Sequence, residues 1–190
     1  MTQTRGLVVS SSTPLIPAFA LAKGSDEAYF TSLLHRAQRY ANVGALIVTL
    51  ASLAAAPLMC LLILGHVSAD VLRFAALLAL GWSINIFSLP LYRAAQGQGT
   101  LRWNMASHAI TGIVVVGVVA LLMPLIGSVA VLVGVAAGLI IGSAVTIVGN
   151  ATAFTVGRAV AYELPTMLAV TGLIGLVCGT LWVGADALSG

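Results

Sequence analysis

The acidic side chains of this chain, which would carry proton or metal chemistry, all lie outside the middle of its apolar runs. There are five: Asp26, Glu27, Asp70, Glu163 and Asp186. Each falls in a polar link or at the edge of an apolar run. Since a proton- or sodium-coupled site in a membrane protein usually uses an intramembrane carboxylate, the sequence predicts no such site in this segment.

The sequence also lacks the patterns that would indicate an enzyme. It contains no paired-carboxylate site, nucleophile elbow, Walker loop or cluster with metal-ligand spacing. A membrane enzyme acting on phosphorylated lipids would show several acids or histidines near one face, and on the inner side beyond residues 25–40 only Glu163 is available. We therefore expect no enzyme, no cofactor and no metal site.

The composition is that of an integral membrane protein. The 190 residues are 60% hydrophobic and only 7% charged, whereas a soluble domain carries about 25% charged residues. Uncharged runs of about 20 residues predict membrane-spanning helices, and the alternating segments of about 10 residues typical of a barrel are absent. The predicted fold class is all-α, a polytopic transmembrane helix bundle.

We expect one transmembrane domain, residues 1–190, with five full spans and a partial N-terminal helix. The spans are predicted at 41–65, 74–92, 104–125, 129–152 and 164–185. Residues 6–22 suit either a signal peptide or the end of a kinked membrane helix, and the charge distribution favours the helix. Residues 25–40 are either an amphipathic interfacial helix or a solvated lead-in to the first span.

The polar link Leu89–Arg102 separates two long apolar runs and is expected to lie in water. Because successive spans alternate in direction, it shares one side of the membrane with the links 23–40 and 157–163. These links hold six basic residues, Lys23, Arg36, Arg39, Arg93, Arg102 and Arg158, whereas the opposite side holds only Arg73. The positive-inside rule then predicts a multi-pass protein of the cytoplasmic membrane with links 23–40, 93–103 and 157–163 in the cytoplasm.

A few polar or small residues inside the spans have two interpretations each. Asn85 lies near mid-depth and either bonds another helix or lines a polar cavity. His108 is either hydrogen-bonded packing or a proton relay. Gly134, Gly138 and Gly142, spaced by four, predict a smooth groove in which another helix packs closely.

The order of these features resembles the polysaccharide flippase branch of the multidrug/oligosaccharidyl-lipid/polysaccharide exporter superfamily. Its "LP-x-x-S … GD-x-E" passage is similar to Leu15-Ile16-Pro17 followed by the Lys-Gly-Ser-Asp-Glu stretch at 23–27. An arginine-bearing helix follows, then a span with Pro57, and then Pro90-Leu91-Tyr92 with a glycine-containing link. The similarity covers roughly residues 6–155. Family members have about twelve to fourteen spans in two lobes, so this chain resembles the C-terminal lobe alone.

The resemblance implies transport of a polyprenyl-pyrophosphate-linked saccharide through a cation-lined cavity. The implied substrate-binding residues are Arg5, Arg93 and Arg102, which would meet the pyrophosphate, and Asn85 as a neutral contact. The expected partners are membrane lipid, the lipid-linked saccharide and a missing N-terminal lobe or partner chain. Nucleic acid is not expected, because no basic patch with interleaved aromatics is present.

Two alternatives remain open from the sequence. The first is one lobe of a cation-coupled multidrug exporter, against which the lack of a buried acid counts. The second is a structural membrane subunit whose glycine stripes only dock partner helices.

Overall fold

The computed structural model describes residues 10, 12–22, 27–154 and 157–189. Within these residues the regular secondary structure consists of seven α-helices and no strand. Five of the helices are long and apolar enough to cross a membrane. The chain is therefore an all-α, multi-pass membrane protein, as its composition predicts.

The longest helix in the described residues, α3, joins two elements that the sequence suggested separately. It runs without interruption from Glu27 to Leu64, so residues 27–40 belong to the same helix as the first predicted span. At 1.5 Å per residue, its 38 residues measure about 57 Å, roughly twice the hydrocarbon thickness of a bilayer. The first turns of α3 therefore extend the helix beyond the apolar part that begins near Ala41.

The link Leu89–Arg102, which the sequence predicts to lie in water, is mostly helical. Helix α4 spans Ala69–Phe87, and after a turn at Ser88 helix α5 spans Leu89–Gln98. Pro90 suits the first turn of α5, where its missing N–H costs nothing, and Gly99 ends the helix at φ 75°.

Helix α5 is held by α2, Leu15–Leu21, which packs along it. The contact is close because Gly97 has no side chain; a Cβ there would lie 2.5 Å from the carbonyl oxygen of Ile16. Phe19 of α2 and Leu91 and Ala94 of α5 are buried in one apolar cluster with Phe30 of α3. Residues 89–98 therefore form a packed helix although their composition is polar.

Helices α6, Arg102–Ile126, and α7, Val129–Ala153, form an antiparallel hairpin. The stripe Gly134, Gly138 and Gly142 lies against α6, where an added Cβ would meet Val119, Val115 and Thr111. The groove predicted from the four-residue spacing is therefore present and is filled by α6. The far side of α6 is exposed, with Ile113 70% and Leu121 72% accessible.

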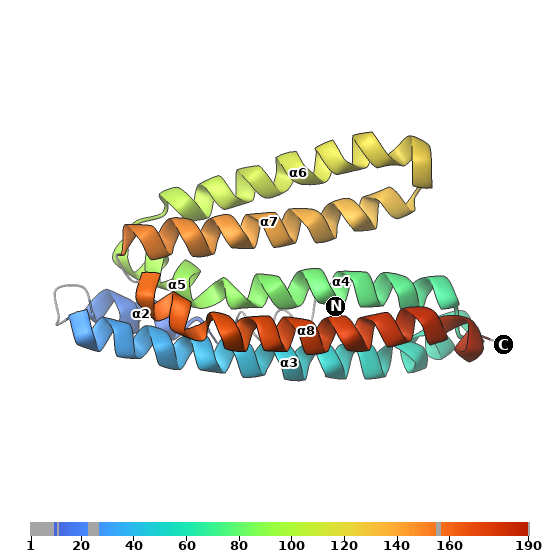
Figure 1. Cartoon of the computed structure of the whole chain (residues 1–190), viewed down its shortest axis with the longest axis horizontal. Coiled ribbons are helices and arrows are strands. Elements are labelled where there is room, and N and C mark those ends of the chain that lie inside the picture. Colours follow the sequence, from blue (N-terminus) through green and yellow to red (C-terminus); the bar gives the residue numbers. More distant parts are fainter. Residues whose placement is uncertain (1–9, 11, 23–26, 155–156, 190) are drawn as a thin grey trace.

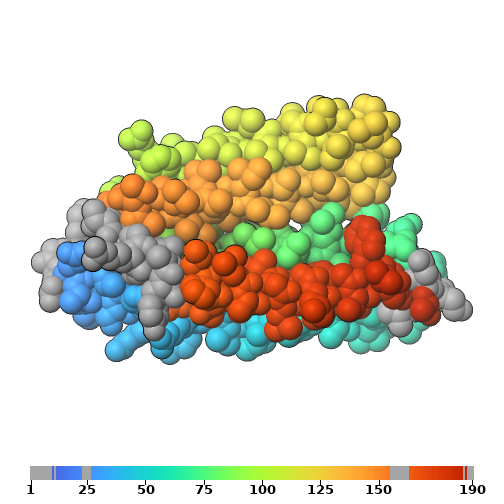
Figure 2. All heavy atoms as spheres, in the orientation of Figure 1, coloured from blue at the N-terminus to red at the C-terminus, as the bar shows by residue number. Residues whose placement is uncertain are grey.

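The remaining span, α8, covers Gly157–Ser189 and packs against α3 and α4 (Figure 1). Helix α4 in turn packs against α7, and it is visible between α7 and α8 in the space-filling view (Figure 2). The starts of α3, α6 and α8 and the ends of α5 and α7 gather at one end of the bundle (Figure 1). That end carries the polar contacts described next.

Candidate functional site

The site begins with a polar stripe on α3. His35, Arg39 and Asn42 are spaced by four and three residues, so the helix places them on one face. These positions follow the same helical period as the apolar positions of α3, but they carry polar side chains. Such a stripe at the edge of a membrane span requires a polar partner on a neighbouring helix.

That partner is Glu163, where the membrane-spanning part of α8 begins. The residue is only 3% exposed. Oε1 of Glu163 lies 3.4 Å from Nδ1 of His35 and 3.5 Å from Nε of Arg39, and Asn42 Nδ2 donates to Oε2 at 3.5 Å. A buried carboxylate is costly unless it is compensated, and here one helix supplies all three of these contacts.

A second layer of hydrogen bonds orients the amide of Asn42. Gln38 Nε2 donates to Asn42 Oδ1 at 3.1 Å and lies 3.2 Å from the carbonyl oxygen of Phe87 in α4. Because Asn42 Oδ1 accepts from Gln38, its Nδ2 is the group turned toward Glu163. The carboxylate is thus linked through α3 to the end of α4.

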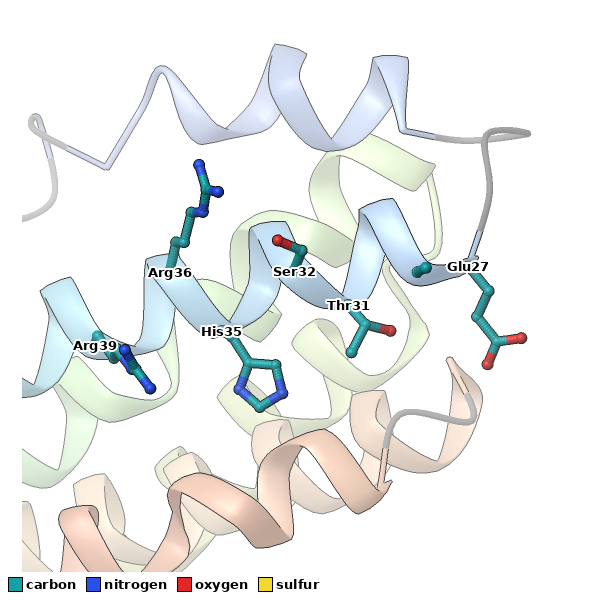
Figure 3. A pocket seen from close by; sticks show the side chains of 7 residues that line it. Glu27, Thr31, Ser32, His35, Arg36 and Arg39 are labelled. Atoms are coloured by element: carbon teal, nitrogen blue, oxygen red, sulfur yellow. The ribbon is translucent and has the colours of Figure 1, made fainter.

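Two cavities meet at Arg39. The larger, about 810 Å³, is open and lined by Glu27, Ala28, Thr31, Ser32, His35, Arg36 and Arg39 (Figure 3). The smaller, about 440 Å³, is lined by Arg39, Asn42, Val43, Glu163 and Thr166. The side chain of Arg39 is 69% exposed, so its guanidinium remains available to water while it pairs with Glu163.

The side chains that line the larger cavity point to two sides of α3. In Figure 3, His35 points toward the ribbon of α8, whereas Ser32 and Arg36 point away from it. Thr31, Ser32 and Arg36 add two hydroxyls and a second guanidinium to the lining. Guanidinium and hydroxyl donors of this kind bind phosphate or carboxylate oxygens.

Within the described residues, no group of three or more His, Cys, Asp or Glu side chains is placed to hold a metal ion. The chemistry available at the cluster is ion pairing, hydrogen bonding and proton exchange. The side chains that face its carboxylate are His35, Arg39 and Asn42. Glu163 is the acceptor for all of these donors.

Of the four residues that the resemblance implied as substrate contacts, the three that the structure describes do not line these cavities. Arg5 lies outside the described residues. Asn85 of α4 donates through Nδ2 to Ser143 Oγ of α7 at 3.1 Å, which is the interhelical alternative predicted for it. Arg102 is exposed at the start of α6, where its guanidinium carbon lies 5.5 Å from the ring centroid of Trp103.

Arg93 is largely buried in α5 rather than free in an aqueous link. It is 8% exposed, and it donates to Ser12 Oγ at 3.2 Å and to Gln96 Oε1 at 2.8 Å. These contacts join α5 to the segment preceding α2. Substrate binding by Arg93, Arg102 or Asn85 stays a prediction.

A second polar network lies beneath the junction of α5 and α6. Asn150 of α7 donates to Asn104 Oδ1 at 2.9 Å, and Asn104 donates to the carbonyl oxygen of Tyr92 at 3.1 Å. Both asparagines are buried. His108 is exposed, with Nε2 3.3 Å from the Tyr92 hydroxyl, and its role as packing or as a proton relay stays a prediction.

Comparisons with known proteins add no relative. No protein-family profile, curated protein or solved structure matches the chain. The function is therefore inferred from the geometry of the α3–α8 cluster and its cavities.

Sequence reasoning noted Glu163 but did not identify the site. The missed signal is the periodicity of His35, Arg39 and Asn42, which places three polar groups on one face of a helix that continues into an apolar span. Recognising that face would have predicted a buried polar partner. Only the three-dimensional packing of α8 on α3 identifies Glu163 as that partner.

Proposed function

We propose that this chain is one lobe of a membrane transporter that flips a polyprenyl-pyrophosphate-linked saccharide across the cytoplasmic membrane. The observation that supports it most directly is the cavity at one end of the apolar bundle, where two guanidinium groups and the single carboxylate of Glu27 are among the lining side chains. Arg36 and Arg39 line this cavity together with the hydroxyls of Thr31 and Ser32. Guanidinium groups offer several donors to the oxygens of a pyrophosphate, and hydroxyls add further contacts.

The side of the membrane in this proposal follows from the distribution of charge. The end that carries the starts of α3, α6 and α8 also carries Arg36, Arg39, Arg93 and Arg102, whereas Arg73 lies in α4 near Trp182 of α8, toward the opposite end. Basic residues are retained on the cytoplasmic side of a membrane. The cavity would then receive its substrate from the cytoplasm.

The lipid tail would be accommodated by apolar helix surfaces rather than by the cavity. Helix α6 presents Ile113, Val116 and Leu121 outward, each about 70% exposed. These surfaces suit lipid or the apolar face of a second lobe. A headgroup in a polar cavity and a tail in the bilayer is the arrangement that a lipid flippase requires.

A second candidate is one lobe of a cation-coupled multidrug exporter. The lack of a buried acid counted against it in the sequence, but Glu163 is buried against α3. A carboxylate in this position gives a coupling cation somewhere to bind. The two candidates differ in the charge of their substrates: the flippase binds a pyrophosphate anion and the drug exporter binds apolar cations.

Binding to the purified chain in phosphatidylcholine nanodiscs tests the proposal. The probe is a polyprenyl pyrophosphate carrying a fluorescent disaccharide, followed by fluorescence anisotropy, with the matching polyprenol and a lipophilic cation dye as competitors. Arg36→Ala with Arg39→Ala should weaken probe binding about tenfold or more, because charge-assisted hydrogen bonds contribute about 1.5–3 kcal/mol each. Arg73→Ala, at the opposite end, is the matched control.

Each outcome of this experiment decides between the candidates. Selective binding of the pyrophosphate that depends on Arg36 and Arg39 supports the flippase lobe. Competition by the cation dye but not by the pyrophosphate lipid supports the exporter lobe. Equal binding of the pyrophosphate and the polyprenol, unchanged in the double variant, contradicts both and leaves a structural subunit.

A further inference from the structure

We propose that the exposed face of α3 near the start of the helix binds an anionic phospholipid of the bilayer, with the phosphate at Arg36 and the acyl chains along Val43 and Ile47. This inference requires only that α3 crosses a membrane, and it does not depend on the substrate proposed above. It is drawn from the exposure, the depth and the charge of the side chains on this one face.

Exposed residues of α3 form one row along the helix. Ser32, Arg36, Val43 and Ile47 follow one another at spacings that are close to whole helical turns, and all of them are exposed. Val43 and Ile47 are 57% and 60% exposed, whereas Ala45, on the other side of the helix, is fully buried. The row therefore faces the surroundings of the bundle, which in a membrane are lipid.

The contacts of Glu163 locate the edge of the apolar layer on α3. The membrane-spanning part of α8 begins at Glu163, and its carboxylate meets Arg39 and Asn42 of α3. At 1.5 Å per residue, Arg36 lies about 4.5 Å outside Arg39 along the helix axis, and Ile47 lies about 12 Å inside it. Because the headgroup layer adds about 5–7 Å on each side of the hydrocarbon, Arg36 is at the depth of the lipid phosphates and Ile47 is at the depth of the acyl chains.

The positive charge of Arg36 has no counter-charge close to it. Arg39 pairs with Glu163, whereas no residue that the structure describes forms an ion pair or hydrogen bond with Arg36. In Figure 3, Arg36 points away from α8. Glu27, the acid that lines the larger cavity, lies nine residues earlier, about 14 Å along the axis and beyond a Debye length of about 8–10 Å. An uncompensated guanidinium at phosphate depth attracts an anionic headgroup.

The donors on this face suit a phosphodiester. A guanidinium offers a planar fork of N–H groups that matches two phosphate oxygens, and Ser32, one turn farther from the hydrocarbon than Arg36, adds a hydroxyl. In phosphatidylcholine the choline cation offsets the phosphate charge, whereas phosphatidylglycerol has no cationic group and carries a net negative charge. The inference is therefore specific for an anionic phospholipid rather than for any bilayer lipid.

The apolar part of the same face suits the acyl chains. Tyr40 is 80% exposed and lies next to the boundary at Arg39, where aromatic side chains with a polar tip are favoured. Val43 and Ile47 continue the row into the hydrocarbon layer. One helix thus presents a cation at headgroup depth, an aromatic ring at the boundary and aliphatic side chains beneath it, which is the order of groups along a phospholipid.

Quenching of a fluorophore on α3 by brominated lipids measures which phospholipid contacts this face. Bimane is attached at Ile47→Cys in the full chain with Cys60 and Cys178 replaced by alanine, in nanodiscs of phosphatidylcholine and phosphatidylglycerol. One of the two lipids carries bromine on its acyl chains in each sample, and the two titrations give the ratio of phosphatidylglycerol to phosphatidylcholine association at the label. We expect a ratio of about five, because one arginine near an anionic membrane surface contributes an attraction of that size.

The same label at Ile113→Cys on α6 is the matched control. Ile113 is 70% exposed, and it lies as many positions after Arg102 as Ile47 lies after Arg36. The guanidinium of Arg102, however, already lies over the ring of Trp103. We therefore expect a ratio near one at Ile113.

Three variants, each read at the Ile47 label, assign the preference to one side chain. Arg36→Ala should lower the ratio to about one. Arg36→Lys keeps the positive charge and should retain a ratio above that at Ile113. Arg102→Ala removes an exposed charge from the same end of the bundle and should leave the ratio at Ile47 unchanged.

Several results would overturn the inference. Equal ratios at Ile47 and Ile113 in the parent chain would show that this face of α3 does not select its lipid. A fall with Arg102→Ala as large as with Arg36→Ala would show attraction by the overall charge of this end, and complete loss in Arg36→Lys would show that the charge is not the cause. Much weaker quenching by both lipids at Ile47 than at Ile113 would show that protein, not lipid, covers the face.

The outcome is separate from that of the proposed function, although both place an anion at Arg36, because the experiment contains no polyprenyl lipid. A ratio near one at Ile47 together with selective pyrophosphate binding overturns this inference and leaves the flippase proposal in place. A preference that depends on Arg36 in a chain that does not bind the pyrophosphate lipid supports this inference and contradicts the flippase proposal.

Discussion

Nδ1 of His35 lies 3.4 Å from Oε1 of Glu163, although 128 positions separate the two residues in the chain. The contact ties the aqueous end of α3 to the point where α8 begins to cross the apolar layer. The contacts of Glu163 with Arg39 and Asn42 also come from α3. The polar contacts of Glu163 therefore come from one face of a single helix, while the apolar side chains of α8 pack against both α3 and α4.

Replacing Asn42 by leucine should destabilise the chain. Asn42 is 2% exposed and donates to the buried Glu163, so the variant leaves a carboxylate oxygen without that donor. We expect a loss of about 1–3 kcal/mol in the free energy of unfolding. Detergent-induced unfolding in bicelles measures it. Val43→Leu, an exposed neighbour on α3, is the control, and equal stability of the two variants would contradict the role of Asn42.

Adding methyl groups to the glycine groove should separate α6 from α7. In Gly134→Ala with Gly138→Ala, each new Cβ would lie 3.0 Å from a backbone carbonyl oxygen of α6, at Val115 and Thr111. Backbone cannot give way as a side chain can, so we expect a loss of about 1–3 kcal/mol per site. Gly112→Ala with Gly117→Ala, where nothing lies within 4 Å of the added Cβ, is the matched control in the same unfolding assay.

The sequence predicted the fold class because the period and length of the apolar runs are properties of single helices. The groove of Gly134, Gly138 and Gly142 was equally readable, since small residues spaced by four must share a face. The structure of the link at Leu89–Arg102 was harder to predict from the sequence. Its glycines and arginines indicated a polar link in water, whereas in the structure Gly97 lies against the backbone of α2 and Arg93 bonds Ser12 and Gln96.

The α3–α8 site was not predictable for a related reason. Glu163 lies at the edge of an apolar run, and that position in the sequence indicated an acid at the membrane boundary rather than a buried one. Its burial depends on which helix packs beside it, and a single sequence does not contain that pairing. The stripe of His35, Arg39 and Asn42 predicts that some polar partner exists but not which of the five acids it is.

Truncating Asn150 should be more damaging than truncating Asn85. Asn150 is fully buried and donates to Asn104, which in turn donates to the carbonyl oxygen of Tyr92, so Asn150→Ala leaves a buried acceptor unpaired. Asn85 is only partly buried, and its partner Ser143 also bonds its own helix at the carbonyl of Leu139. We expect Asn150→Ala to lose about 1–3 kcal/mol and Asn85→Ala less than half of that.

The same unfolding measurement tests how the asparagine network is coupled. A double-mutant cycle between Asn104→Ala and Asn150→Ala should give an interaction free energy of about 0.6 kcal/mol or more, because such cycles isolate the pairwise term. The cycle between Asn85 and Asn150 should give a value near zero, since the two amides have separate partners. Comparable coupling in both cycles would show that the effects are transmitted through the helices rather than through these hydrogen bonds.

The arginines at the start of α6 and within α5 should differ in what they contribute to transport. Arg102 is exposed and stacks on Trp103, so Arg102→Ala should leave the unfolding free energy nearly unchanged. Arg93 is enclosed by Ser12 and Gln96, so Arg93→Ala should lower stability as well as charge. With transport measured as the rate at which dithionite gains access to a fluorescent polyprenyl-pyrophosphate disaccharide in vesicles, the double variant should be slower than Arg73→Ala.

The stability measurement decides how that transport result is interpreted. If Arg102→Ala alone slows transport while the chain remains as stable as the parent, a cation at this end acts on the pyrophosphate. If only variants containing Arg93→Ala slow transport, and in proportion to their lost stability, the effect comes from loosening α5 from the segment before α2. Equal slowing by Arg73→Ala would contradict a special role for this end of the bundle, because Arg73 pairs with Asp70 at the opposite end.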